Sequence, residues 1–204
     1  MLLCPSISGS RGWKVAFSML FVGPFRGLEM MWFSTKGKLA LIRRWIWKQR
    51  KSGVRWNYPT VRVLKFNVDG SSRGNQGPIG IDSILRKHDG AMLCMFSAYI
   101  GCNHSSFVEI TAILKSCQLC ESVKYLPNHN IIIESDSKSV VSWVNREGGV
   151  GNVRLLDAIM DIKDILARLS PKVLVQFVPR SANVFVEFLA KQGAFSGLVR
   201  EGWV

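Results

Sequence analysis

The sequence predicts an α/β fold in which a five-stranded mixed sheet carries helices on both faces. Three strand-like runs follow one another after residue 60, and helical and strand-like patterns alternate from about residue 106 onward. The chain has 204 residues and 48% hydrophobic content, which is enough for one globular core and too little for two large domains.

The first three strands are expected at 61–68, 78–87 and 91–100. Gly70 lets the backbone turn directly after the first strand, and residues 88–90, His-Asp-Gly, form the turn between the second and third. These three runs are the first part of the predicted mixed sheet.

The remaining elements alternate between helix and strand. A helix is expected over 106–124, followed by a short apolar strand at 131–135 whose β-branched residues are typical of burial on both faces. The pattern then predicts helices near 137–147 and 153–169, a fifth strand at 172–178, and a last helix at 183–192 that ends at Gly193.

Charge divides the chain into unequal parts. Residues 1–60 hold eleven Lys and Arg against the single acid Glu29, so their net charge is +10, whereas residues 61–204 carry +3. We therefore predict a basic N-terminal extension at 1–55, disordered or partly helical, a domain at 56–195, and a C-terminal tail at 196–204. A basic arm of this kind suggests an anionic partner, most commonly nucleic acid, although a solvated tail without a partner stays open.

The cysteines and the apolar runs indicate a protein that stays inside the cell. Five cysteines without framework spacing predict reduced thiols, and the Cys117-x-x-Cys120 pair fits a helix core better than a zinc site. No stretch is long and apolar enough to span a bilayer, so no membrane partner is expected. We expect a monomer in the nucleus or cytoplasm, while the acid-free composition of residues 1–28 leaves an organellar leader open.

Four acids lie at element boundaries or on predicted helices: Asp69, Glu109, Asp136 and Glu187. They are separated by 40, 27 and 51 residues, so only a folded chain could gather them.

Each of these acids also has a local explanation. Asp69 precedes Gly70 in a common hairpin-turn dipeptide, and Glu109 follows Ser106 at capping-box spacing. An Asp at a strand-to-helix junction, as at 136, is a preferred N-cap, and an acid four residues before a lysine, as at 187, forms an ordinary helical ion pair.

Five stretches of the chain stand in an informative order: NVDGSSRGNQGPIG, SILRKHDG, FVEITAIL, IIIESDSKSVVSWV and FVPRSANVFVEFLAKQGA. Together they resemble the ribonuclease H superfamily, and within it the plant reverse-transcriptase-like group, which is related to the ribonuclease H domains of non-LTR retrotransposons. The resemblance covers about residues 56–195 and implies a ribonuclease H-like sheet.

The resemblance implies a magnesium-dependent hydrolase, an endonuclease that cleaves the RNA strand of an RNA–DNA hybrid. Asp69, Glu109, Asp136 and Glu187 match the family's catalytic metal-binding positions. Packed carboxylates need a cation to neutralise them, and hard oxygen ligands favour two Mg²⁺ or Mn²⁺ ions. Ser71, Ser72 and Asn75 are candidate contacts to the RNA strand, with turn chemistry as the alternative explanation.

The chain departs from the family pattern at several positions. Glu187 stands where Asp is usual, Phe177 stands where His is common, and Asp82 and Ser83 replace small glycines in the second strand. A buried Asp82 would need a partner or an edge position. The departures favour a weakened enzyme, and they leave open a catalytically degenerate nucleic-acid-binding module of retroelement origin or a structural domain left by a retroelement.

Overall fold

The computed structural model describes residues 56–72, 77–102, 104–122, 128–145, 155–184, 186–187 and 200–203. The predicted extension at 1–55 lies outside these residues and stays a prediction. In chain order the elements are β1 (Val63–Ser72), β2 (Pro78–Arg86), β3 (Met92–Cys102), α2 (Ser105–Ser122), β4 (Asn130–Ser135), α3 (Lys138–Asn145), α4 (Leu156–Leu169), β5 (Val173–Phe177), the 3₁₀-helix η3 (Arg180–Ala182) and β6 (Arg200–Trp203).

The strands form one mixed sheet in the order β5-β4-β1-β2-β3-β6. β1, β2, β3 and β6 pair antiparallel, whereas β4 and β5 add parallel to β1 and to each other. The α/β class and the five predicted strands are confirmed, in the predicted chain order.

The sixth strand was not predicted. Residues 196–204 were expected to form a tail, but Arg200–Trp203 pairs with Ser97–Cys94 of β3 and so extends the sheet. The sequence REGW is too short and too polar to show strand alternation. It can still form an edge strand, because edge pairing is made by backbone groups rather than by side chains.

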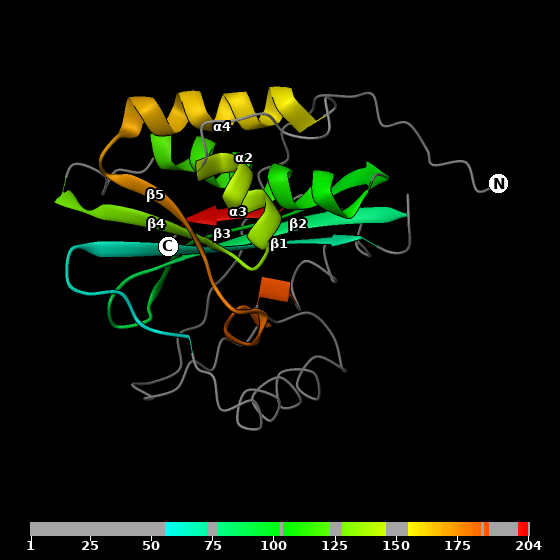
Figure 1. Cartoon of the computed structure of the whole chain (residues 1–204). Helices are drawn as coiled ribbons and strands as arrows, with labels where there is room; N and C mark the ends of the chain where they lie inside the picture. The colour runs from blue at the N-terminus through cyan, green and yellow to red at the C-terminus, as the bar shows by residue number, and fades with distance from the viewer. Residues whose placement is uncertain are drawn as a thin grey trace, which may run out of the picture.

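Helices α2, α3 and α4 cover one face of the sheet, with α2 next to the strands and α4 packed on α2 (Figure 1). Alternate residues of β1, namely Leu64, Phe66 and Val68, point into the core beneath these helices. The period of two along the strand thus sends every second side chain to this face. The side chains between them, Lys65 and Asn67, face the other way.

The opposite face receives the start of a further helix. Val186 is fully buried against Ile84, Met92 and Met95, so the segment after η3 packs on the second face of the sheet. The predicted helix at 183–192 lies mostly outside the described residues, but its first turn places helical structure on both faces, as expected.

The second face also holds a buried polar network centred on Glu134 of β4. Its Oε2 accepts hydrogen bonds from Trp56 Nε1 and Asn67 Nδ2, each at 2.8 Å. Its Oε1 lies 2.7 Å from Lys65 Nζ and accepts a hydrogen bond from Gln176 Nε2 at 3.1 Å. Glu134 is only 2% exposed, so these four donors and the lysine charge replace the water that it loses.

The same network fixes the segment that precedes β1. The guanidinium of Arg86 stacks on the Trp56 ring at 3.8 Å and donates a hydrogen bond to Asn67 Oδ1. Lys65 Nζ donates to the carbonyl of Asn57 at 3.2 Å. Trp56 and Asn57, which precede β1, are therefore held against the sheet by this network and act as a clamp on it.

Two composition-based expectations can be compared with the structure. Cys117 and Cys120 are free and fully buried among core side chains, and burial raises the pKa of the Cys117 thiol to about 12, so the core interpretation is confirmed. Among the described residues, no helix combines the length and apolar character that crossing a membrane requires.

Replacing Trp56 tests the contribution of this clamp. Trp56→Ala should lower the free energy of unfolding by about 3–5 kcal/mol, because a buried indole is lost and Glu134 loses a donor. Urea unfolding of the full chain measures the change. Val61→Ala is the control, since Val61 is 70% exposed in the same segment and its truncation should cost less than about 0.5 kcal/mol. Equal midpoints for Trp56→Ala and the parent would contradict the assignment.

Candidate functional site

Asp69 lies where β1 extends beyond the end of β4. The parallel pairing of β1 with β4 stops at Val68 opposite Ser135, whereas the antiparallel pairing with β2 continues to Ser72. The predicted strand end at 68 and the Asp-Gly hairpin turn are therefore wrong, because the β2 ladder carries the strand past Gly70. Asp69 is 2% exposed and lies one residue beyond the last β1 residue that pairs with β4.

Gly70 is required for packing rather than for a turn. A Cβ built at this position would lie 2.7 Å from the carbonyl carbon of Val108 and 2.8 Å from the amide nitrogen of Glu109. Real Cβ atoms do not approach backbone so closely, so only glycine lets α2 pack directly on β1 at this point. The Gly70 N–H also donates a hydrogen bond to the Glu109 carboxylate.

Glu109 lies in the second turn of α2, which begins at Ser105. The amides of Phe107 and Val108 both donate to the carbonyl of His104, so the helix starts earlier than a capping box at Ser106 would require. The capping explanation for Glu109 is wrong. Its side chain instead reaches across the contact between α2 and β1 toward Asp69.

Asp136 follows β4 immediately and precedes α3. The Val141 amide donates to the carbonyl of Ser137, so Ser137 and not Asp136 occupies the first capping position of the helix. The N-cap explanation is therefore wrong for Asp136, whose side chain is 7% exposed.

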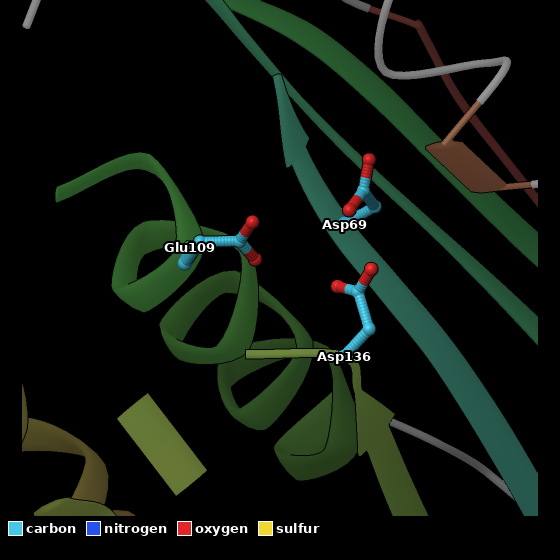
Figure 2. A group of neighbouring side chains, drawn as sticks. All are labelled: Asp69, Glu109 and Asp136. Atoms are coloured by element: carbon cyan, nitrogen blue, oxygen red, sulfur yellow. The ribbon is translucent and has the colours of Figure 1, made fainter. Parts of the chain in front are cut away.

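The structure brings three of the predicted acids together. One carboxylate oxygen from each of Asp69, Glu109 and Asp136 lies within 4.8 Å of the other two. Figure 2 shows the carboxylates of the strand, the helix and the β4–α3 junction converging on one space. Their predicted proximity is thus observed for residues 40 and 27 positions apart.

Glu187 stands beside this group and is held by a separate anchor. Asn183 Nδ2 donates to the Val68 carbonyl at 2.7 Å, and the Asn183 carbonyl accepts from the amides of Val186 and Glu187. The Glu187 carboxylate lies near enough to raise the pKa values of Asp69 and Asp136, although it is not one of the three acids within 4.8 Å.

Glu187 forms an ion pair that the sequence did not suggest, while its predicted pair with the lysine four residues later stays a prediction. Arg180 Nη2 of η3 lies 2.9 Å from Glu187 Oε1, and Arg180 Nε lies 3.8 Å from Asp136 Oδ2. Lys191, the predicted helical partner, lies outside the described residues. Arg180 therefore joins the fourth acid to the group of three.

The site strongly disfavours full ionisation of its acids. Burial, followed by the charges of Glu109, Asp136 and Glu187, raises the pKa of Asp69 well above its ordinary value. Burial and then Asp136 raise the pKa of Glu109 to about 8, and burial raises the pKa of Asp136. Arg180 lowers all three pKa values, which shows that positive charge stabilises the ionised site.

A bound divalent ion fits these residues. Glu109 Oε2 is buried and accepts no hydrogen bond within the part of the chain that the structure describes. Three carboxylates that face one another, one with a vacant acceptor, form a hard oxygen donor set that suits Mg²⁺ or Mn²⁺. This environment differs from that of Glu134, whose two oxygens are saturated by protein donors.

Of the three candidate RNA contacts, the structure describes two, Ser71 and Ser72. Ser71 and Ser72 lie half-buried in β1, opposite Gly80 and Ile79 of β2, and not in a turn. Asn75 lies outside the described residues. The structure brings both serines to the same end of β1 as Asp69.

Two residues that depart from the family pattern, Asp82 and Phe177, lie on the sheet. Asp82 is fully buried opposite Asp69 on the central strand β2, so the edge position considered for it is excluded. Phe177 ends β5 at 37% exposure, with Lys138 Nζ 5.0 Å from its ring centroid.

Sequence reasoning assigned no role to Arg180 or Asn183. Both lie in the PRSAN motif that carried the resemblance, and both contact the site directly or through β1. The dense spacing of polar residues before Glu187 was the available signal, but it did not show what each would contact.

Comparisons with known proteins agree with this architecture. A family model described as reverse transcriptase-like matches residues 67–193. No curated protein matches the chain significantly.

Among solved structures, LC11 RNase H1, isolated from compost by a metagenomic approach, is 24% identical with a TM-score of 0.61 and covers 66% of this chain and 97% of its own. The same protein in complex with an RNA/DNA hybrid is 23% identical with a TM-score of 0.59, and the match covers 65% of this chain and 96% of that one. A foamy viral protease–reverse transcriptase bound to RNA/DNA hybrid is 20% identical with a TM-score of 0.54, and the match covers 66% of this chain and 20% of that one. These similarities show a ribonuclease H-like fold.

The raised pKa of Glu109 makes stability depend on pH. Below its ordinary value of 4.5 both folded and unfolded chains hold the proton, but between 4.5 and about 8 only the folded chain keeps it. The folded state is therefore favoured by the proton on Glu109 at low pH, and this contribution to the free energy of unfolding is lost as pH rises from 4.5 toward 8. In EDTA, Glu109→Gln should raise the melting temperature relative to the parent more at pH 8 than at pH 5.

Thermal unfolding at both pH values measures this difference. Glu121→Gln is the matched control, because it removes a carboxylate from the exposed side of the same helix. A Glu109→Gln effect that is the same at pH 5 and pH 8 would show that the site does not resist the ionisation of Glu109.

Proposed function

The chain belongs to the reverse transcriptase-like family, and on that premise we propose that it is a metal-dependent ribonuclease that cleaves the RNA strand of an RNA–DNA hybrid. The observation that carries the proposal is the convergence of Asp69, Glu109 and Asp136 within 4.8 Å on a ribonuclease H-like sheet. The similar LC11 RNase H1 has been solved with an RNA/DNA hybrid, which supports this substrate class.

The acids divide the work of holding the ions. Asp69 stands within β1, Asp136 directly follows β4, and Glu109 is held by the Gly70 amide, so their oxygens are positioned before an ion arrives. Glu187, anchored through Asn183, would supply a fourth ligand. When bound, two Mg²⁺ or Mn²⁺ ions would supply activation of a water molecule and stabilisation of the leaving oxygen in an in-line phosphodiester hydrolysis.

Recognition of the substrate would come from other residues. The RNA strand differs from DNA by its 2′-hydroxyls, which Ser71, Ser72 and Asn75 could contact as donors or acceptors. The extension at 1–55, which carries a net charge of +10, would add sequence-independent affinity for phosphates.

A second candidate is a nucleic-acid-binding module that does not cleave. The specific observation that favours it is the ion pair of Glu187 with Arg180, which engages an oxygen of the fourth acid. Phe177 also offers no proton-transfer group at a position where the resemblance leads one to expect His.

Asp69→Asn tests whether Asp69 is a metal ligand needed for cleavage or only a structural residue. The substitution removes a charged ligand while conserving shape, so cleavage of a labelled hybrid with Mg²⁺ should fall at least about a hundredfold. Hybrid binding should survive, because phosphate contacts by Lys and Arg supply most of the affinity.

The control for this assay is Asp164→Asn, which makes the same chemical change at an exposed position of α4 and should leave the rate unchanged. A parent protein that binds hybrid but cuts none of it with Mg²⁺ or Mn²⁺ would establish the binding module instead. Cleavage by Asp69→Asn at the parent rate would remove Asp69 from the site.

The length of Glu187 should affect the choice of metal. From the backbone fixed by Asn183, Glu reaches further than Asp and keeps more rotamer freedom, so Mn²⁺ should support cleavage better than the more demanding Mg²⁺. Glu187→Asp should raise the Mg²⁺-supported rate severalfold, and Glu187→Gln should lower the rate with either ion. Unchanged rates for both variants would mean that Glu187 serves only its ion pair with Arg180.

A further inference from the structure

Arg180 occupies an unusual position for an ion-paired arginine. Its guanidinium contacts two acids of the site, Glu187 at 2.9 Å and Asp136 at 3.8 Å, although 69% of its side chain is exposed. The two acids are themselves shielded, with side-chain exposures of 15% and 7%. Arg180 thus reaches the acidic site from solvent, and its exposed side chain could turn away without opening the core.

Charge balance indicates when it would turn away. Burial and neighbouring acids raise the pKa values of Asp69, Glu109 and Asp136, whereas the charge of Arg180, which contacts Asp136 and Glu187, lowers all three. Two divalent ions bring four positive charges to four carboxylates. With such ions bound, the charge of Arg180 would no longer be needed at the site, because ions held by Glu187 and Asp136 would repel its guanidinium.

The chemistry of the guanidinium indicates where it would go. Its planar fork of donors matches phosphate as well as carboxylate, and a phosphodiester held over the ions would lie on the solvent side, which Arg180 already faces. η3 is fixed beside the site, because the Ala182 and Asn183 amides donate within the turn and the Asn183 side chain bonds to β1. The side chain can therefore move while its backbone stays in place.

We propose that Arg180 is a resident counterion that exchanges its two carboxylates for a phosphate of the nucleic acid when divalent ions bind. The inference rests on the proposed function for the identity of the phosphate. It makes Arg180 a binding residue whose contribution depends on the ions.

The first test uses no nucleic acid, so its outcome is independent of whether the protein cleaves. Mn²⁺ is titrated calorimetrically into the full chain, and the parent and variant proteins are measured under the same buffer conditions. Arg180→Gln should bind Mn²⁺ about threefold to tenfold more tightly than the parent, because the competing cation is gone. A purely structural role for Arg180 requires the opposite sign, since the loss of an anchor for Glu187 would weaken binding.

Arg168→Gln is the matched control for this titration. Arg168 is also exposed and also pairs with a glutamate at 2.8 Å, but Glu121, its partner, lies on the outer side of α2. Its replacement should leave Mn²⁺ affinity unchanged. Equal or weaker Mn²⁺ binding by Arg180→Gln, or no Mn²⁺ binding by either protein, overturns the proposal.

The second test measures hybrid affinity over a salt series, once with EDTA and once with saturating Ca²⁺, and a gel confirms that the RNA stays intact. With Ca²⁺, Arg180→Gln should bind several-fold more weakly, and its slope of log affinity against log salt should be smaller by about one phosphate contact. With EDTA the parent and variant slopes should agree, because the arginine is engaged by carboxylates.

Arg168→Gln should match the parent slope in both conditions. Slopes that differ equally with and without Ca²⁺, or that do not differ at all, overturn the exchange. A protein that shows the exchange but cleaves no hybrid would refute the proposed ribonuclease activity alone, so the two failures are distinguishable.

Discussion

Repulsion among buried carboxylates is the constraint on which this molecule depends. Asp69, Glu109 and Asp136 come within 4.8 Å because Gly70 lets α2 touch β1 and because β1 extends beyond β4. Such a cluster destabilises its own ionised form, so the rest of the fold must hold it rigidly while a cation neutralises it. The continuous ladder with β2 provides that rigidity, since it carries β1 through the site without a turn.

Two acids on one short segment show how environment separates structure from chemistry. Glu134 and Asp136 are two residues apart, and both side chains are nearly inaccessible to solvent. Glu134 receives donors from Trp56, Asn67 and Gln176 together with the charge of Lys65, so it is fully compensated and holds the second face together. Asp136 faces other acids and one exposed arginine, which leaves it able to bind a cation. A saturated carboxylate stabilises a fold, whereas an unsaturated cluster is available for function.

The second face of the sheet links stability to the site. Its polar network fixes β1 and β4 in register, and the segment after η3 closes over it through Val186 and the Asn183 bond to β1. Glu187 and Arg180 are therefore positioned by segments that pack on the same face of the sheet as Trp56. Their placement depends on packing between segments more than one hundred residues apart, as the Asn183–Val68 bond illustrates.

The sequence by itself determined the order and type of the elements, because hydrophobic periodicity and turn residues are local signals. It also identified the acids at 69, 109 and 136, since their spacing within ordered motifs requires a fold to gather them. Only the tertiary structure decided that Gly70 serves a close contact, that Asp69 lies within a strand, and that Ser137 rather than Asp136 caps α3. It alone added β6 and placed Arg180 on Glu187 and Asp136, because edge pairing and ion pairs across elements depend on which surfaces meet, and no local pattern encodes that.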